Sequence, residues 1–320
     1  MYSRIVGTGK YLPERILTNA DLEKMVETTD EWIRTRTGIE VRHIAADDEA
    51  TSDLAYRAGL AAIADAGLSP SDIDLVLVGT TTPDLIFPNV ACLVQEKLGI
   101  SGGPAFSLEA ACSGFLYALV VADQFIRGGQ VRRALVIGAE TMSRIVDWTD
   151  RETCVLFGDG AGAVVIEAAD QPGILYSTLG ADGRYRDLLY ASSGVSTRHR
   201  EKADIAALRM KGNEVFKVAV KTLENLVDDV VEKSRIDKSE IDWLIPHQAN
   251  IRIIAATAKR LQMPMDKVIL TVRDHGNTSA ASVPMALDTA VRDGRVKRGD
   301  LLLLEAFGGG FTWGASLVRY

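Results

Sequence analysis

Several features that are common in other classes of protein are scarce in this sequence. Only three cysteines occur, Cys92, Cys112 and Cys154, which indicates no disulfide framework and favours a reducing cytoplasm. No apolar run approaches the roughly 18 residues of a membrane span, and the N-terminal segment lacks the apolar core of a signal peptide. A net charge of -7 gives the whole protein no field that attracts nucleic acid or an anionic membrane. We therefore expect a cytoplasmic protein that binds neither nucleic acid nor membrane.

Phosphate-binding loops are also missing. The two glycine clusters, FGDGAGAVV from Phe157 and FGGGFTWGAS from Phe307, fit neither GxxxxGK[ST] nor a GxGxxG that leads into a helix. Both lead into strand-like segments. Glycine permits tight turns and lets bare backbone approach a ligand, so each cluster is either a hairpin turn or a source of N–H groups for an oxyanion hole.

Apolar strand-like runs alternate with helical patterns, which predicts an α/β fold with buried sheets. The expected strands are 74–79, 105–108, 133–139, 162–168, 242–246, 301–305 and 311–318. The expected helices are 88–98, 113–126, 213–234, 250–261 and 278–291. The polar stretch 183–211 is long for a connection, so it is either a functional loop or locally mobile.

An internal repeat divides the chain. A shift of 165 residues places Arg127 on Arg292, Glu140 on Glu305 and Cys112 on Asn277. A shift of 168 aligns IDLVLVGT with IDWLIPHQ and puts His247 opposite Gly79. We expect two duplicated halves, 1–170 and 171–320, with an insertion at 17–43 in the first and chemistry at their junction.

Cys112 lies in EAACSGF, between a short strand and a buried helix. Unpaired N–H groups and the helix dipole favour thiolate at such a position. The alternative is a buried apolar residue, which is common for free cysteine.

His247 and Asn277 occupy comparable junctions in the second half. His247 follows the strand-like WLIP, where catalytic side chains gather in α/β folds. Asn277 lies in HGNTSAAS before a helix, where it can cap that helix, serve the site, or do both.

The segments EAACSGF, PHQAN, GNTSAASVP and FGGGFTWG, together with GTGKYLPE, TNADLEKMV and TTDEWIRTRTGI near the start, resemble the β-ketoacyl-acyl-carrier-protein synthase III family. This resemblance covers nearly the whole chain. It implies a thiolase-like five-layered αβαβα fold, a homodimer, and decarboxylative condensation of an acyl-coenzyme A primer with malonyl-acyl-carrier protein. Coenzyme A enters as a substrate, and no cofactor or metal is implied.

The resemblance also implies roles for individual residues. Cys112 would be the acylated nucleophile, with His247 and Asn277 binding the malonyl thioester carbonyl, and the N–H groups of Cys112 and Gly309 would form the oxyanion hole. The implied coenzyme A contacts are Thr28, Trp32, Arg36, Arg151, Asn213 and Asn250, with the adenine between Trp32 and Arg151. Phe87 of a partner subunit and Phe307 would bound the acyl pocket. Arg252, Lys259 and Arg260 would dock the acidic carrier protein.

Other functions fit parts of the sequence. Cys…His…Asn is also the order in papain-like hydrolases, but the CGSCW-type context is missing. A non-catalytic scaffold that binds carrier protein and a related enzyme of secondary metabolism are further alternatives. Glu152 stands where the family often has a small residue. The primer chain length is not readable from the sequence, and stretch 183–211 and Phe87 are expected to influence it.

Overall fold

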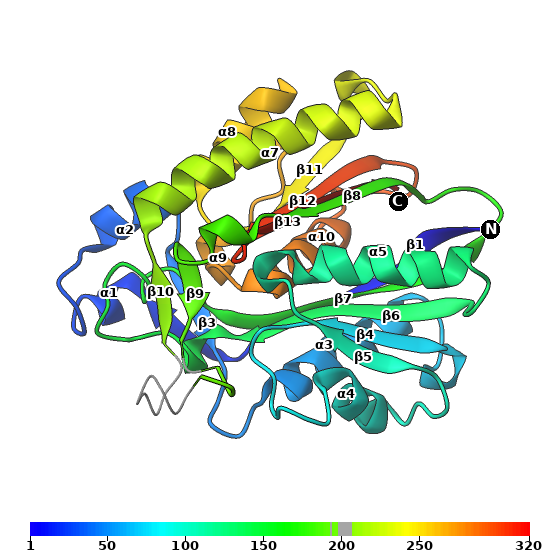
Figure 1. The fold of residues 1–320 in the computed structure, drawn as a ribbon, viewed down its shortest axis with the longest axis horizontal. Coiled ribbons are helices and arrows are strands. Elements are labelled where there is room, and N and C mark those ends of the chain that lie inside the picture. Colours follow the sequence, from blue (N-terminus) through cyan, green and yellow to red (C-terminus); the bar gives the residue numbers. More distant parts are fainter. Residues whose placement is uncertain (193, 198–206) are drawn as a thin grey trace.

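Two mixed β-sheets form the centre of the protein (Figure 1). The computed structural model describes residues 1–192, 194–197 and 207–320. The first sheet has the strand order β1 (Tyr2–Tyr11), β7 (Asp159–Ala169), β6 (Arg133–Thr141), β4 (Leu75–Gly79) and β5 (Ala105–Leu108). The second has the order β11 (Trp243–Pro246), β12 (Leu301–Gly308), β13 (Thr312–Arg319) and β8 (Ile174–Ala181).

The central strands are buried on both faces. Strand β4 runs parallel to β5 and β6, and β11 runs parallel to β12, whereas the other neighbours are antiparallel. The sequences LVLVG of β4 and LLLLEAFG of β12 are buried at every position. Such continuous apolar runs are typical of strands covered by helices on both sides.

Helices cover and separate the two sheets, so the protein has five layers (Figure 1). Helices α3 (Thr51–Asp65) and α4 (Val90–Leu98) pack on the outer face of the first sheet. Helices α5 (Gly114–Arg127) and α10 (Ser282–Arg292) lie between the sheets. Helices α7 (Gly212–Ser234) and α8 (Ile251–Leu261) cover the second sheet. The expected thiolase-like αβαβα architecture is confirmed.

Each predicted strand and helix is present, with ends shifted by a few residues. The sequence patterns missed α3, a 15-residue helix with a weakly amphipathic face, and strand β8. Helix α3 completes the first half of the fold by covering the first sheet, and strand β8 completes the second half by forming an edge of the second sheet.

The internal repeat is real, but its register differs from the expectation. Cys112 lies in a three-residue 3₁₀ turn, Ala111–Ser113, whose counterpart is Ser279–Ala281, and the first residues of both turns have positive φ, 44° and 48°. Cys112 therefore corresponds to Ala280 and not to Asn277. The shift of 165 fails here because α10, with 11 residues, is three residues shorter than the 14-residue α5.

The alignment of β12 with β6 must be corrected in the same way. Val78 of β4 pairs with Ile137 of β6, and Pro246 of β11 pairs with Glu305 of β12. The pairing restores the shift of 168, so Glu140 and Glu305 are not equivalent. Their side chains also point to different layers. Glu140 faces the middle layer, where it contacts Ser279, and Glu305 lies on the outer sheet face that α7 and α8 cover.

The remaining elements lie beside these layers. Strands β2 (Arg15–Thr18) and β3 (Val41–Ile44) pair with each other around α1 (Asn19–Leu22) and α2 (Asp30–Thr37). Strands β9 (Leu189–Ala191) and β10 (Leu208–Met210) form a second small ribbon, and α9 (Val272–His275) is a single turn. Part of the expected functional loop 183–211, namely 193 and 198–206, lies outside the described residues. Over the described chain, no helix is long and apolar enough to cross a membrane.

Candidate active site

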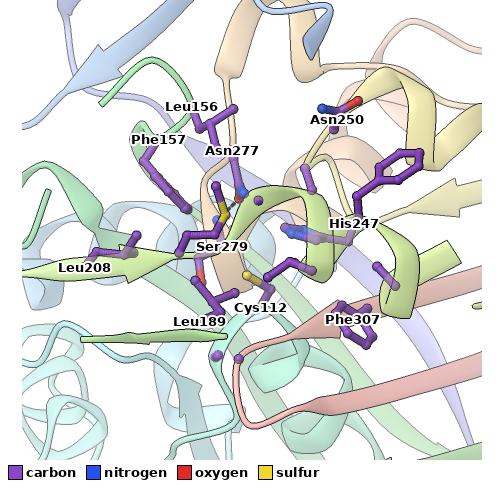
Figure 2. A pocket seen from close by; sticks show the side chains of 18 of the residues that line it. Cys112, Leu156, Phe157, Leu189, Leu208, His247, Asn250, Asn277, Ser279 and Phe307 are labelled. Carbon is purple, nitrogen blue, oxygen red and sulfur yellow. Dashed lines mark hydrogen bonds between the residues drawn. The ribbon is translucent and has the colours of Figure 1, made fainter. Parts of the chain in front are cut away.

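A cavity of about 1220 Å³ brings Cys112, His247 and Asn277 together (Figure 2). The three residues come from the turn before α5, the loop after β11 and the loop before α10. Each side chain is largely buried. The predicted meeting of chemistry from the two halves is therefore present in the geometry.

Cys112 is a thiol in the resting protein. Its side chain is 8% exposed, and burial raises its pKa to about 12; the nearby Glu140 carboxylate adds to the rise and the Ser279 hydroxyl offsets part of it. The expectation that the helix start favours thiolate is not met, because desolvation outweighs it. The sulfur must therefore lose its proton during the reaction.

The second glycine cluster lies directly against the cysteine. A Cβ atom on Gly308 would come within 2.6 Å of the Cys112 backbone nitrogen, so only glycine permits this approach. Gly308 pairs with Thr312 at the end of the β12–β13 hairpin. Gly309, the expected oxyanion donor, also lines the cavity. The hairpin interpretation of this cluster is confirmed, and the oxyanion role stays a prediction.

His247 is held on two sides. Its backbone N–H donates to the Glu305 carbonyl oxygen over 2.8 Å, and its Nδ1 lies 2.6 Å from the Ser282 hydroxyl. Burial lowers the pKa of its imidazole to about 4, so the ring is neutral at pH 7. A neutral imidazole can present one N–H donor to the cavity.

Asn277 has a defined amide orientation. Its Oδ1 accepts the Ser279 N–H over 2.9 Å, which leaves the amide NH2 group on the opposite side (Figure 2). The backbone is fixed as well, because Asn277 N–H donates to Leu156 and its carbonyl accepts from Gly158. Asn277 thus stabilises the turn before α10 and lines the cavity, but it does not cap that helix, whose N-cap residue is Ala281.

The cavity mouth contains most of the expected coenzyme A residues. Trp32, Arg36 and Arg151 line it, and the guanidinium carbons lie 5.8 Å (Arg36) and 4.9 Å (Arg151) from the Trp32 ring centroid. An adenine between Trp32 and Arg151 needs two van der Waals contacts of about 3.5 Å, or roughly 7 Å in all. Arg151 must therefore swing off the indole before a base can enter.

The other expected contacts differ in their surroundings. Asn213 and Asn250 line the cavity, and the Asn250 Oδ1 caps α8 by accepting the Arg252 N–H over 2.8 Å. Thr28 is not among the lining residues, but its buried hydroxyl has no hydrogen-bond partner among the described residues. Glu152 lines the mouth beside Arg151.

The two predicted pocket phenylalanines lie in different places. Phe307 is buried in the cavity wall, with its ring centroid 4.7 Å from that of Phe311. Phe87 is 83% exposed and does not line the cavity of its own chain. Its neighbours Leu85 and Ile86 are exposed as well.

The three basic residues of α8 are not equivalent. Arg252 lies at the cavity rim with its guanidinium carbon 4.8 Å from the Phe216 ring centroid. Lys259 is exposed. Arg260 forms a salt bridge with Asp228 of α7, which already neutralises much of its charge.

Sequence reasoning missed Ser279, Ser282 and Glu305, all of which line the cavity or hold a lining residue. The two serines lie in SAAS, where small polar residues resemble an ordinary helix start. Glu305 gave a clearer signal, because it is the one acidic residue in the apolar run LLLLEAF. Within the described residues, no group of three or more His, Cys, Asp or Glu side chains is arranged to hold a metal ion.

Comparisons with known proteins agree with this geometry. The family model described as 3-Oxoacyl-[acyl-carrier-protein (ACP)] synthase III matches residues 106–183, and its C-terminal counterpart matches 231–320. A beta-ketoacyl-[acyl-carrier-protein] synthase III of Thioalkalivibrio sulfidiphilus is 64% identical over 320 residues, covering 100% of this chain and 99% of the relative.

Solved structures extend the likeness to the fold. The 3-oxoacyl-[acyl-carrier-protein] synthase III of Aquifex aeolicus superimposes with a TM-score of 0.94 at 50% identity, covering 99% of this chain and 100% of the other. A priming beta-ketosynthase from the R1128 polyketide biosynthetic pathway gives a TM-score of 0.95 at 36% identity, covering 99% and 96%.

Proposed function

The chain belongs to the 3-oxoacyl-[acyl-carrier-protein] synthase III family, and on that basis we propose that Cys112, His247 and Asn277 carry out its condensation. The protein is a condensing acyltransferase of the kind that initiates fatty acid synthesis. The observation that supports the residue roles best is the shared cavity of a thiol, a neutral imidazole and an oriented amide.

The first step transfers the primer to Cys112. The sulfur attacks the thioester carbon of acyl-coenzyme A, the coenzyme A sulfur leaves, and the proton of the Cys112 thiol passes to it. Negative charge collects on the carbonyl oxygen in the transition state. The N–H groups of Cys112 and Gly309 would stabilise that charge, at about 3 kcal/mol for each donor.

The second step forms the new carbon–carbon bond. Malonyl-acyl-carrier protein loses CO2, and the electron pair of the broken bond creates an enolate on the thioester. Neutral N–H donors from His247 and Asn277 stabilise its oxygen without giving up a proton. The enolate carbon then attacks the acyl group, and the released Cys112 thiolate takes up a proton.

The coenzyme A site would be the mouth formed by Trp32, Arg36 and Arg151, with Asn213 and Asn250 along the arm and Thr28 at its outer edge. Thr28 does not line the cavity and its hydroxyl is buried, so the expected contact through Thr28 rests on the family resemblance alone. The guanidinium groups supply charge for phosphate recognition. Coenzyme A serves as a substrate, and this scheme needs no cofactor.

Two protein partners follow from the exposed surfaces. We place the acidic carrier protein on α8 at Arg252 and Lys259, with a smaller contribution from Arg260. We also propose a homodimer in which Phe87 of one subunit closes the acyl pocket of the other, because the exposed run Leu85–Ile86–Phe87 is an apolar patch that a partner would bury.

We also propose that the chain consists of two halves, 1–170 and 171–320. The strands of the first sheet all fall in the first half and those of the second sheet in the second half, which supports the division. The first half would supply the nucleophile, with the insertion 17–43 at the coenzyme A mouth, and the second half the two donors. All three cysteines are unpaired, which supports a cytoplasmic location.

A condensation assay tests the function. Acyl-coenzyme A donors from acetyl to octanoyl are offered with malonyl-acyl-carrier protein, and coenzyme A release and CO2 are measured together. The proposal predicts equal amounts of both products with at least one donor. Without the malonyl acceptor, at most one equivalent of coenzyme A per Cys112 should be released, and repeated turnover under those conditions would instead indicate a hydrolase.

A further inference from the structure

One carboxyl group in the cavity wall, that of Glu305, has no hydrogen-bond partner among the described residues. Glu305 lies near the end of β12, on the same strand face as Leu301 and Leu303, which pack against α7 and α8. Its side chain is 1% exposed, and neither carboxylate oxygen has a partner among the described residues. The Thr257 hydroxyl lies close enough to offset part of the rise in the carboxyl's pKa, but it is directed to the Ile253 carbonyl oxygen, 3.5 Å away, and forms no hydrogen bond with Glu305. A buried polar group of this kind is costly and calls for an explanation.

Glu140 shows how this protein treats a carboxyl with a structural role. It is equally buried, yet its oxygens accept hydrogen bonds from Thr80, Thr81, Thr82 and Ser279 at 2.6–3.2 Å. Glu305 instead shares its cavity wall with apolar residues of α7 and α8, among them Leu223 and Ile254. Its missing partner is therefore not supplied by the fold.

The cavity can supply that partner. Glu305 belongs to the same cavity wall as Cys112 and His247, and its own backbone carbonyl accepts the His247 N–H. Burial raises the pKa of Glu305 to about 8, so the carboxyl is mostly neutral at pH 7. A neutral carboxyl offers one O–H donor and one carbonyl acceptor.

We propose that Glu305 is a hydrogen-bonding site of the substrate cavity for one uncharged polar group that both donates and accepts a hydrogen bond. A secondary amide of the pantetheine arm can use either its N–H or its carbonyl oxygen toward the carboxyl, and a water molecule fixed in the same place can both donate and accept. The assignment rests on the proposed function, because that function brings a pantetheine arm into the cavity.

Two variants separate this role from a structural one. Glu305→Gln keeps a donor and an acceptor in the same shape, whereas Glu305→Leu removes both. If the orphaned carboxyl serves a ligand, Glu305→Leu raises the melting temperature by about 2–5 °C in the free protein. It also reduces kcat/KM for acylation of Cys112 by acetyl-coenzyme A about 3- to 10-fold, while Glu305→Gln stays near wild type.

Two control variants test whether these effects come from the Glu305 carboxyl group itself. Leu303→Met changes the same face of the same strand without a polar group and should alter neither readout. Glu140→Gln disturbs a carboxyl that is fully bonded, so it should lower the melting temperature, in contrast to Glu305→Leu.

A donor without amides distinguishes the two ligands. With an acetyl thioester of a simple alkanethiol, the penalty of Glu305→Leu disappears if Glu305 binds an arm amide and persists if it holds a water. Equal kcat/KM values for wild type, Glu305→Gln and Glu305→Leu with both donors would overturn the assignment. Failure of wild-type protein to bind coenzyme A in a calorimetric titration would contradict the proposed function itself.

Discussion

The Nδ1 atom of His247 lies 2.6 Å from the hydroxyl oxygen of Ser282. That oxygen also faces the Gln248 N–H at 3.4 Å, so it can accept from the backbone and donate its own hydrogen to Nδ1. We infer the matching tautomer of the neutral imidazole, with the proton on Nε2. In that tautomer Ser282 holds His247 as a hydrogen-bond donor toward the cavity.

Replacing Ser282 with alanine should remove the hydrogen bond that holds His247 in the tautomer with its proton on Nε2. We expect kcat for condensation to fall about 10-fold, which corresponds to ~1.4 kcal/mol of barrier, while acylation of Cys112 changes little. Rapid-quench measurement of the two half-reactions checks this. Ser177→Ala is the matched control, because Ser177 forms a 2.9 Å hydrogen bond with Ser316 and neither residue belongs to the site. An equal loss in both half-reactions would show that Ser282 acts on the whole fold.

Removing a donor itself should have a larger effect. His247→Ala and Asn277→Ala are each expected to slow malonyl decarboxylation about 10²- to 10³-fold, since each removes one enolate donor. Both variants should still form the acyl-enzyme. Release of CO2 from malonyl-acyl-carrier protein measures the first effect and the mass of the protein the second. Undiminished decarboxylation in both variants would remove them from the proposed roles.

The pH dependence of stability offers a separate test of Glu305. Burial raises the pKa of this carboxyl from its ordinary value of 4.5 to about 8 in the folded protein. The unfolded chain therefore holds fewer protons between these values, and the folded protein loses stability as the pH rises from about 4.5 to 8. The slope is roughly 1.4 kcal/mol per pH unit at most.

Glu305→Gln lacks this titration. The difference in unfolding free energy between Glu305→Gln and wild type should grow steadily in favour of the variant over the same interval. Chemical denaturation at several pH values measures it, and Glu140 contributes equally to both proteins. A constant difference from pH 5 to 8 would mean that Glu305 titrates normally.

Carrier-protein docking should depend unequally on the basic residues of α8. Arg252→Ala and Lys259→Ala are expected to raise KM for malonyl-acyl-carrier protein several-fold, with a smaller effect of Arg260→Ala because Asp228 already pairs with Arg260. These effects should weaken with added salt. Acylation by acetyl-coenzyme A serves as the control reaction for Lys259→Ala. Identical KM values at low salt would move the docking surface elsewhere.

Much of the fold and site follows from sequence patterns that carry strong physical constraints. Buried strands such as β4 and β12 are continuous apolar runs, and Cys112, His247 and Asn277 stand where strands and loops meet helices. The ordered motifs of the family resemblance added the residues of the cavity mouth. These predictions depend on local sequence. The structure brings Cys112, His247 and Asn277 into one cavity, whereas Thr28 does not line it, and the roles of these residues stay predictions.

The errors have different causes. The repeat placed Cys112 opposite Asn277 because α10 is three residues shorter than α5 and the segment after α10 is longer by the same amount. No local sequence signal marks this deletion and insertion. The thiolate expectation considered the helix start and not the burial of Cys112 or the Glu140 charge across the fold. The direct stack of Arg151 on Trp32 joins segments far apart in the sequence.

The mass of Cys112 after exposure to acyl-coenzyme A tests the central claim most directly. Wild-type protein is incubated with acetyl-coenzyme A, digested and measured by mass spectrometry, with Cys112→Ser and the other two cysteines as internal controls. Our account predicts one acetyl group on Cys112, which disappears when malonyl-acyl-carrier protein is added. An unmodified Cys112 with every short acyl donor, or an acetyl group that remains after malonyl-acyl-carrier protein is added, would contradict it.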